Sequence, residues 1–265
     1  MNILITGGCG FIGSHFVRTW YNRYPEDTVF NLDLLTYAGN RDNLADIEAN
    51  ERLLDIDVRR YHFIQGSITN VQLLDALFQE YHFDIVVNFA AETHVDRSII
   101  SMTDFINTNI GGVRCLSEAV RAHKVPRFVH ISTDEVYGSV DAGSSNEESA
   151  LRPSNPYSSS KAAADLIILS FIRTHQLPAI IIRGSNNYGT FQYPEKLIPL
   201  AISNLIEGKK IPIHGTGKHV RSWLHVEDFC DAIDLLAHKA PIREVFNVSA
   251  EERTNLEVLE ILTKH

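Results

Sequence analysis

The chain has 265 residues, of which 44% are hydrophobic and 22% are charged, an ordinary balance for a globular protein in water. Its formal net charge of −9 argues against a general nucleic-acid or membrane surface, since both require clustered lysine and arginine. A small anionic substrate remains compatible with this balance, because a few local arginines can hold it within an acidic protein.

The cysteines and the N-terminus bear on the compartment. Cys9, Cys115 and Cys230 are far apart and match no metal-binding spacing or CxxC motif, so we expect no metal site and a reducing environment. The first residues, MNILIT, lack the basic stretch and apolar core of a signal peptide. No apolar run approaches the roughly 20 residues that a membrane helix needs. We therefore expect a cytoplasmic protein.

Short β-branched runs alternate with longer amphipathic stretches in the first two thirds of the chain. Strands are expected at residues 2–6, 28–33, 61–65, 84–90, 127–132 and 178–183, and helices at 11–23, 70–80, 103–123 and 157–175. Strands that are apolar throughout and separated by helices indicate a parallel sheet covered on both faces. The expected fold class is α/β, with a doubly wound, Rossmann-like sheet.

The alternation breaks after Arg183, at the polar and aromatic loop GSNNYGTFQYPEK. Beyond it we expect a helix at 196–207, a short strand near 211–214, a helix at 226–238, a strand at 244–248 and a helix at 255–265. Residues 1–183 are thus predicted to form one domain and 184–265 a smaller, incomplete substrate lobe. Residues 226–250 are expected to return and pack on the first domain.

A glycine-rich turn, TGGCGFIGSH, follows the first strand and opens the first helix. It fits GxGxxG through Gly8, Gly10 and Gly13, and GxxGxxG through Gly7, Gly10 and Gly13. Such glycines let the backbone approach a pyrophosphate at the positive end of a helix. Asp33 ends the second strand, where a carboxylate can bind a ribose 2′-hydroxyl and would repel a 2′-phosphate. The pattern predicts that residues 1–183 bind NAD, the alternative being a turn that only links strand to helix.

Tyr157 and Lys161 are i and i+4 in the predicted helix after NP, so they share a helical face. A free tyrosine has a pKa near ~10, too high for a base at neutral pH, but a nearby ammonium and a nicotinamide cation both favour the phenolate. The pair could then accept a proton from a sugar hydroxyl as hydride leaves for NAD. Tyr-x-x-x-Lys occurs often by chance, and the upstream glycine turn and Thr133 make the catalytic interpretation the stronger one.

Thr133 is followed directly by two acids, Asp134 and Glu135, at the end of a predicted buried strand. In a continuing strand adjacent side chains point to opposite faces, so the chain must turn near Thr133 if all three are to reach one ligand. The alternative is a helix N-cap at Ser132 or Thr133, with the acids favoured by the helix dipole. The neighbouring Tyr–Lys pair favours acid–base chemistry.

Together these motifs resemble the extended short-chain dehydrogenase/reductase family. More narrowly, the chain is similar along its whole length to the dTDP-glucose 4,6-dehydratases of that family through GGCGFIGSH, LTYAGN, AAETHVDRSI, STDEVYG, PYSSSKAAAD, NNYG and PEKLIPL. The resemblance implies dehydration of a nucleoside-diphosphate glucose, above all dTDP-glucose, to the 4-keto-6-deoxy sugar. In that reaction C4 is oxidised, water is lost across C5 and C6, and hydride returns to C6, with Glu135 matching the base and Asp134 the acid.

Further contacts follow from the resemblance. The cofactor would also touch Phe11, Ile12, Ser67, Ile68, Ala90 and Ala91, although Ser67 and Ile68 could equally form a wall packed without ligand. The implied substrate contacts are Thr93, His94, Asn186, Asn187, Lys196, Leu197, His214, Arg221 and Asn255. His94 could instead be structural, and Asn186 and Asn187 could belong to an ordinary Asx-rich loop. The family usually has Tyr, Asp and Asp at the positions of His214, Ser222 and Ser67. These departures leave open whether the nucleotide of the substrate carries thymidine or uridine.

Three function classes remain. Nucleotide-sugar 4-epimerases and decarboxylases keep the Tyr and Lys but lack the Asp–Glu pair, and a non-catalytic NAD-binding module is the third alternative. Family members continue for several dozen residues beyond the stretch that matches this chain, including part of the nucleotide clamp, so slow turnover is expected. They also dimerise through helices matching residues 103–123 and 157–175, and we expect a homodimer with no nucleic-acid or membrane partner.

Overall fold

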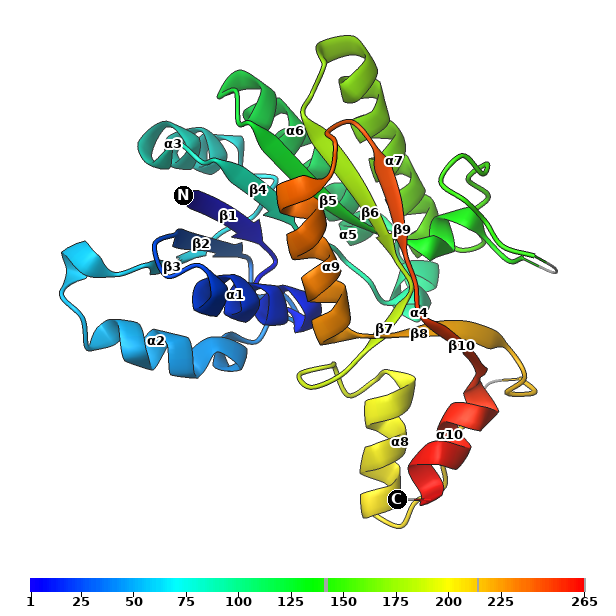
Figure 1. Ribbon diagram of the computed structural model, residues 1–265. Coiled ribbons are helices and arrows are strands. Elements are labelled where there is room, and N and C mark those ends of the chain that lie inside the picture. The colour runs from blue at the N-terminus through cyan, green and yellow to red at the C-terminus, as the bar shows by residue number, and fades with distance from the viewer. Residues whose placement is uncertain (141–142, 214, 265) are drawn as a thin grey trace.

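A parallel β-sheet forms the centre of the protein in the computed structural model, which describes residues 1–140, 143–213 and 215–264. Within these residues seven strands pair in the order β3-β2-β1-β4-β5-β6-β9 (Figure 1). The strands are β1 (Asn2–Thr6), β2 (Thr28–Asp33), β3 (Tyr61–Gln65), β4 (Ile85–Asn88), β5 (Arg127–Thr133), β6 (Ala179–Gly184) and β9 (Val245–Val248). This order and the parallel pairing match the expected doubly wound sheet, with a switch point between β1 and β4.

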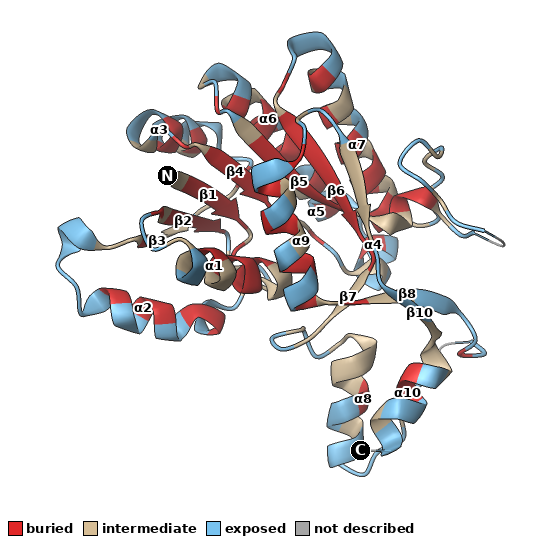
Figure 2. Ribbon diagram, viewed as in Figure 1, coloured by how far each residue is buried: buried red, intermediate tan, exposed pale blue. Residues whose placement is uncertain are grey.

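Helices cover both faces of the sheet. One face packs against α1 (Phe11–Arg23) and α9 (Val226–Lys239), and the other against α3 (Val71–Tyr81), α6 (Val113–Ala122) and α7 (Pro156–His175). Figure 2 shows the inner strands almost wholly buried between these layers. Burial on both faces explains why β1, β4, β5 and β6 read as continuous apolar runs rather than as alternating ones. No helix of the described ranges is both long and apolar enough to cross a bilayer.

The predicted helix at 103–123 is confirmed over residues 103–122. It consists of α5 (Thr103–Phe105), a π-helical segment (Ile106–Gly112) and α6, and it is preceded by an unexpected short helix, α4 (Val95–Ile100). A Cβ on Gly112 would lie 2.3 Å from the Ile68 side chain, so the glycine permits close packing. Two further short elements, η1 (Arg41–Leu44) and α2 (Ala45–Arg52), were also not expected, and η2 (Ile56–Val58) follows them.

The part of the chain beyond β6 contains a second sheet, in the order β10-β8-β7. It is built from β7 (Asn186–Tyr188), β8 (Val220–His225) and β10 (Glu251–Thr254) and is accompanied by α8 (Leu197–Ile206) and α10 (Asn255–Lys264). The expected strand near 211–214 is wrong over 211–213, which form no strand, and residue 214 lies outside the described residues. The strand of this region comes later, at β8, because the Gly215 and Gly217 turn precedes it.

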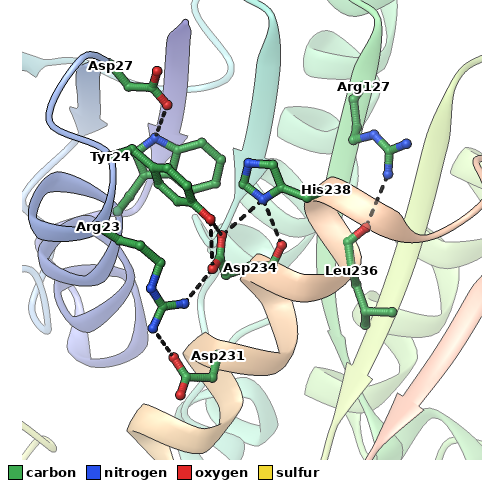
Figure 3. Close-up of polar contacts among 9 residues, drawn as sticks. Arg23, Tyr24, Asp27, Arg127, Asp231, Asp234, Leu236 and His238 are labelled. Atoms are coloured by element: carbon green, nitrogen blue, oxygen red, sulfur yellow. Dashed lines mark hydrogen bonds and ion pairs between the residues drawn. The ribbon is translucent and has the colours of Figure 1, made fainter.

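The α9–β9 segment lies on the first sheet rather than on the second. Strand β9 pairs with β6, and α9 packs along α1, where a partly buried polar cluster joins the two helices. In this cluster Asp234 accepts from Arg23 and from the Tyr24 hydroxyl, and Arg23 also reaches Asp231. Figure 3 shows these side chains meeting between the two helices, together with His238. The cluster therefore lies at the C-terminal end of α1, about 18 Å along the helix from the glycine turn.

Candidate active site

A cavity of about 340 Å³ opens at the carboxyl ends of the parallel strands, at the switch point where doubly wound sheets bind their ligands. Its walls come from the glycine turn, the ends of β2, β4, β5 and β6, and the start of α7. The cavity brings together every residue predicted to act in catalysis or to bind the cofactor. These residues are Gly7, Gly10, Phe11, Ile12, Gly13, Asp33, Ser67, Ile68, Ala90, Ala91, Thr133, Asp134, Glu135, Tyr157 and Lys161.

The glycine turn has the geometry of a dinucleotide cradle. Gly7 has a φ of +71°, and a Cβ there would lie 2.6 Å from the backbone nitrogen of Ala90. At Gly13 a Cβ would lie 2.2 Å from the Gly7 carbonyl oxygen. Helix α1 begins at Phe11, and its first turn contains no acidic residue to compete with an anion. The turn therefore fits a pyrophosphate at the positive end of α1.

Asp33 lies at the carboxyl end of β2, on the cavity wall. Its Oδ2 accepts from the Cys9 backbone N–H at 2.9 Å and its Oδ1 from that of Leu35 at 2.7 Å. Burial raises the pKa of Asp33, and these two N–H groups oppose the shift. Each oxygen keeps a second lone pair, so the carboxylate can also accept from a ribose hydroxyl. Cys9, beside it, is buried with a pKa raised to about 12, which leaves the thiol unreactive.

The start of α7 positions Tyr157 and Lys161. Asn155 caps the helix in a capping box with Ser158, and the proline between Asn155 and Tyr157 occupies the first helical position. The Tyr157 backbone N–H donates to Ser98 Oγ at 3.1 Å, which ties the helix to α4. Lys161 Nζ donates to the Ile131 carbonyl at 2.7 Å, at the end of β5. Both side chains are almost fully buried.

Burial controls the charge of this pair. It raises the pKa of the Tyr157 phenol well above its ordinary value, and the negative Glu135 adds to the shift, whereas the Thr133 hydroxyl opposes it. Burial also lowers the pKa of Lys161 to about 8, although Asp165 opposes that shift. Tyr157 is therefore a poor base on its own and requires positive charge beside it. Lys161 supplies such a charge only below about pH 8.

The acid pair lies where β5 ends. Thr133 is extended, and a short 3-10 helix, η4 (Asp134–Tyr137), starts directly after it, so the chain turns where catalysis would require. Thr133 Oγ1 also accepts from the Glu135 backbone N–H at 3.3 Å, so the capping role and the cavity-lining role coexist. Burial raises the pKa of Asp134 to about 6, Glu135 adds to this, and Arg221 opposes it. Asn155 Nδ2 donates to Glu135 Oε2 at 3.3 Å.

The residues expected to bind substrate are less closely gathered. Thr93, Asn186, Asn187 and Lys196 line the cavity. His94 does not line the cavity. Its Nε2 pairs at 2.9 Å with Oε2 of Glu195, and Glu195 does line the cavity.

Three others lie outside the lining. Leu197 begins α8, Asn255 begins α10, and Arg221 is exposed on β8, close enough to lower the pKa of Asp134. His214 lies outside the described residues.

Several cavity residues were not predicted from the sequence, and two of them make specific side-chain contacts. Tyr37 stacks under the Arg97 guanidinium, 3.8 Å from the ring centroid, and meets the Tyr193 ring at 5.4 Å. Glu195 holds His94, as described above. Tyr37 lies in the LTYAGN motif and Glu195 in PEKLIPL, so the motifs marked both segments, but nothing in their spacing indicated these pairings. Asn155 could have been found, because Asn before Pro is a helix-start signal.

Comparisons with known proteins agree with this geometry. Residues 3–249 match the model of the NAD dependent epimerase/dehydratase family. The dTDP-glucose 4,6-dehydratase of Streptomyces niveus is 47% identical over 269 residues, covering 100% of this chain and 77% of that protein. The crystal structure of dTDP-glucose 4,6-dehydratase from Bacillus anthracis in complex with NAD superposes with a TM-score of 0.90 at 45% identity, over 100% of this chain and 80% of that one. A UDP-glucose 4-epimerase from Thermotoga maritima superposes with a TM-score of 0.88 at 28% identity, over 100% and 82%.

Proposed function

Because the chain belongs to the NAD-dependent epimerase/dehydratase family, we propose that it converts dTDP-glucose to the 4-keto-6-deoxy sugar as an NAD-dependent 4,6-dehydratase. One observation carries the choice of dehydration over epimerisation. Asp134 and Glu135 line the same cavity as Tyr157 and Lys161, so an acid and a base lie within one site beside the oxidising pair. An epimerase needs only the oxidising pair.

NAD fits the cradle described above, with the pyrophosphate at the start of α1 and the adenosine ribose on Asp33. The adenine would lie toward Ser67 and Ile68, and the nicotinamide toward Tyr157 and Lys161. The carboxylate of Asp33 would repel a 2′-phosphate, which favours NAD over NADP. The cofactor, when bound, would supply the hydride acceptor for C4 and the hydride donor for C6.

The oxidation step falls to three side chains. Tyr157 removes the proton of the C4 hydroxyl, and Lys161, charged below about pH 8, stabilises the phenolate that this requires. Hydrogen bonding with the Thr133 hydroxyl lowers the pKa of Tyr157 against the effect of burial. The Lys161 bond to the Ile131 carbonyl fixes the ammonium at the end of β5 while the phenol changes its charge.

The elimination step falls to the acid pair. Oxidation makes the C5 proton acidic, and Glu135 removes it while Asp134 protonates the departing C6 hydroxyl, which leaves as water. A carboxyl with a pKa raised to about 6 can hold a proton near neutral pH, so the structure favours Asp134 as the acid. Asn155 orients Glu135 by donating to Oε2. After hydride returns to C6, Glu135 delivers a solvent-derived proton to C5.

Deuterated water separates this function from its competitors. With dTDP-glucose we expect a 4-keto-6-deoxy product that carries deuterium at C5. The hydrogen added to C6 should carry no deuterium, because it comes from C4 of the same sugar and not from the solvent. An epimerase would leave C6 oxygenated, and a module that only binds NAD would leave the sugar unchanged. Either result would overturn the proposed function.

A homodimer and a cytoplasmic location are part of the same proposal. Apolar side chains of Ile99, Ile100, Ile106 and Leu166 are exposed on neighbouring elements around α7, the helix for which the family resemblance implies a role in dimerisation. The buried, unpaired cysteines are typical of a reducing compartment. Imaging of a fluorescently tagged protein tests the proposed cytoplasmic location.

Substitution in this face should separate the subunits. We expect Leu166→Asp to convert the dimer to a monomer, because a charge would be buried in the apolar interface. Sedimentation measures the mass. Leu235→Asp, at an equally exposed position on α9, is the matched control and should leave the dimer intact. A monomeric parent protein would refute the proposed dimer.

A further inference from the structure

A buried ion pair lies directly behind the catalytic lysine. Asp165 follows Lys161 by one turn of α7, so the two side chains share a helical face. Asp165 is fully buried, and its Oδ2 accepts from Arg183 Nε on β6 at 2.9 Å. Its Oδ1 has no hydrogen-bond partner among the residues that the structure describes. Arg183 thus contacts the carboxylate through one oxygen only, and the Ser132 hydroxyl on β5 lies close enough to lower the pKa of Asp165.

Arg183 continues the contact toward the acid pair. Its NH1 donates to the Tyr137 hydroxyl at 2.6 Å, and that hydroxyl donates to Asn247 Oδ1 on β9 at 2.8 Å. Tyr137 is the last residue of η4, the turn that begins with Asp134 and Glu135. The ion pair therefore joins the helix that carries Tyr157 and Lys161 to the turn that carries both acids.

From this geometry we propose that Asp165 and Arg183 form a positioning pair for the reaction: Asp165 keeps Lys161 charged, and Arg183 holds the η4 turn through Tyr137. The proposal rests on the proposed function for its consequences in catalysis. Its effect on Lys161 does not, because the charge of that lysine can be measured without turnover. A purely structural ion pair would have no effect on the titration of Lys161.

The groups around Lys161 decide the sign of the effect. The charged or titratable side chains that face it are Tyr157 and Asp165 on α7, His130 on β5 and, behind Asp165, Arg183 on β6. Burial lowers the pKa of both His130 and Lys161, and each cation would oppose the other. Asp165 is the negative charge that opposes burial at Lys161. Without it, Lys161 would face an unpaired guanidinium and would lose its proton at a lower pH.

The direct test is an NMR titration of Lys161 in the NAD-bound protein labelled with carbon-13 lysine, with the signal assigned through Lys161→Met. In the parent we expect a midpoint near pH 8. In Asp165→Asn the midpoint should fall by at least about one pH unit. The alkaline limb of the kcat profile should move with it, so that kcat of the variant is about tenfold lower at pH 8 than at about pH 6. An unmoved midpoint, or an equal loss of kcat at every pH, would overturn the proposal.

Asp234→Asn is the matched control, since Asp234 is also buried and paired with an arginine, between α1 and α9 (Figure 3). It should lower stability without moving the Lys161 midpoint. If Asp234→Asn moved the Lys161 midpoint as far as Asp165→Asn does, the loss of any ion pair would have this effect through stability alone, and the proposal would be wrong.

Tyr137→Phe tests the second half of the pair and replaces Asp165→Asn if that variant does not fold. It removes only the hydroxyl between Arg183 and Asn247. We expect slower deuterium exchange at C5 with an unchanged Lys161 midpoint. Exchange at the parental rate would refute the link to the acid pair. If the protein were an epimerase, the lysine titration would still respond to Asp165→Asn while C5 exchange would be absent in the parent, so the two failures are distinguishable.

Discussion

Tyr157→Phe is expected to lower kcat with dTDP-glucose by roughly 10³-fold, because a positioned general base typically contributes 10²–10⁴-fold. The variant loses one hydroxyl at a position where the ring is buried against Phe105, so the fold should be retained. No oxidation at C4 can begin without a proton acceptor, so no reduced cofactor should accumulate. NAD affinity should change little, since the glycine turn and Asp33 are untouched. Steady-state kinetics and the absorbance of reduced nicotinamide measure these effects.

The control is Tyr24→Phe, which removes a phenol from the α1–α9 cluster far from the cavity. It should leave kcat close to the parental value. If Tyr157→Phe kept more than about a tenth of the parental rate, Tyr157 would not be the base, and the oxidation step would have to be assigned to another group. Lys161→Met should resemble Tyr157→Phe above and below pH 8 alike, because the substitution removes the ammonium at every pH.

The sheet could be predicted from the sequence because its strands are buried on both faces. Residues 2–6 and 28–33 form β1 and β2 with the expected bounds, since an apolar run flanked by turn residues permits few alternatives. The π-helical segment inside 103–123 was not predictable in the same way. Gly112, the last residue of this segment, packs against Ile68, which is far from it in the sequence, so local spacing gives no sign of this contact. The small second sheet was missed for a related reason, because its strands are short and partly exposed.

The reacting groups could be predicted where chemistry and local spacing coincide. The i, i+4 interval indicates Tyr157 and Lys161, and adjacency at a strand end indicates Asp134 and Glu135. Arg183 carries no such signal, because its partner Asp165 comes from another element and the pair forms only when α7 packs on β6. Leu197 and Asn255 were named from the resemblance alone, and the structure places both outside the cavity lining.

The acid pair should separate the two halves of the reaction. In Glu135→Gln and Asp134→Asn, oxidation at C4 remains possible, so reduced cofactor should build up after mixing with dTDP-glucose, while product formation falls by roughly 10²–10⁴-fold. Glu135→Gln should also abolish deuterium exchange at C5, because the base that removes this proton is gone. Asp134→Asn should keep part of that exchange and fail at the loss of the C6 hydroxyl. Rapid-mixing absorbance and NMR of the recovered sugar report the two steps separately.

Asp134→Asn should combine this loss of activity with a gain in stability at alkaline pH. The folded-state pKa of Asp134 is raised from 3.8 to about 6, so its contribution to stability is fully present below about pH 4 and is lost as pH rises through about 6. Above that pH the folded protein holds a half-buried carboxylate beside Glu135, and asparagine removes this charge. We expect the variant to exceed the parent by about 1–3 kcal/mol in free energy of unfolding at pH 8, with little difference at pH 4.

Urea denaturation at the two pH values measures this difference, and the activity assay is run on the same preparations. An inactive variant that is more stable than its parent cannot have lost activity by misfolding, so the pair of results would assign the loss to the missing proton donor. Equal stability at pH 8 would mean that Asp134 is already ionised near its ordinary pKa, and it could not then serve as the acid. The C6 hydroxyl would need another proton donor, and the dehydration mechanism would have to be rebuilt around it.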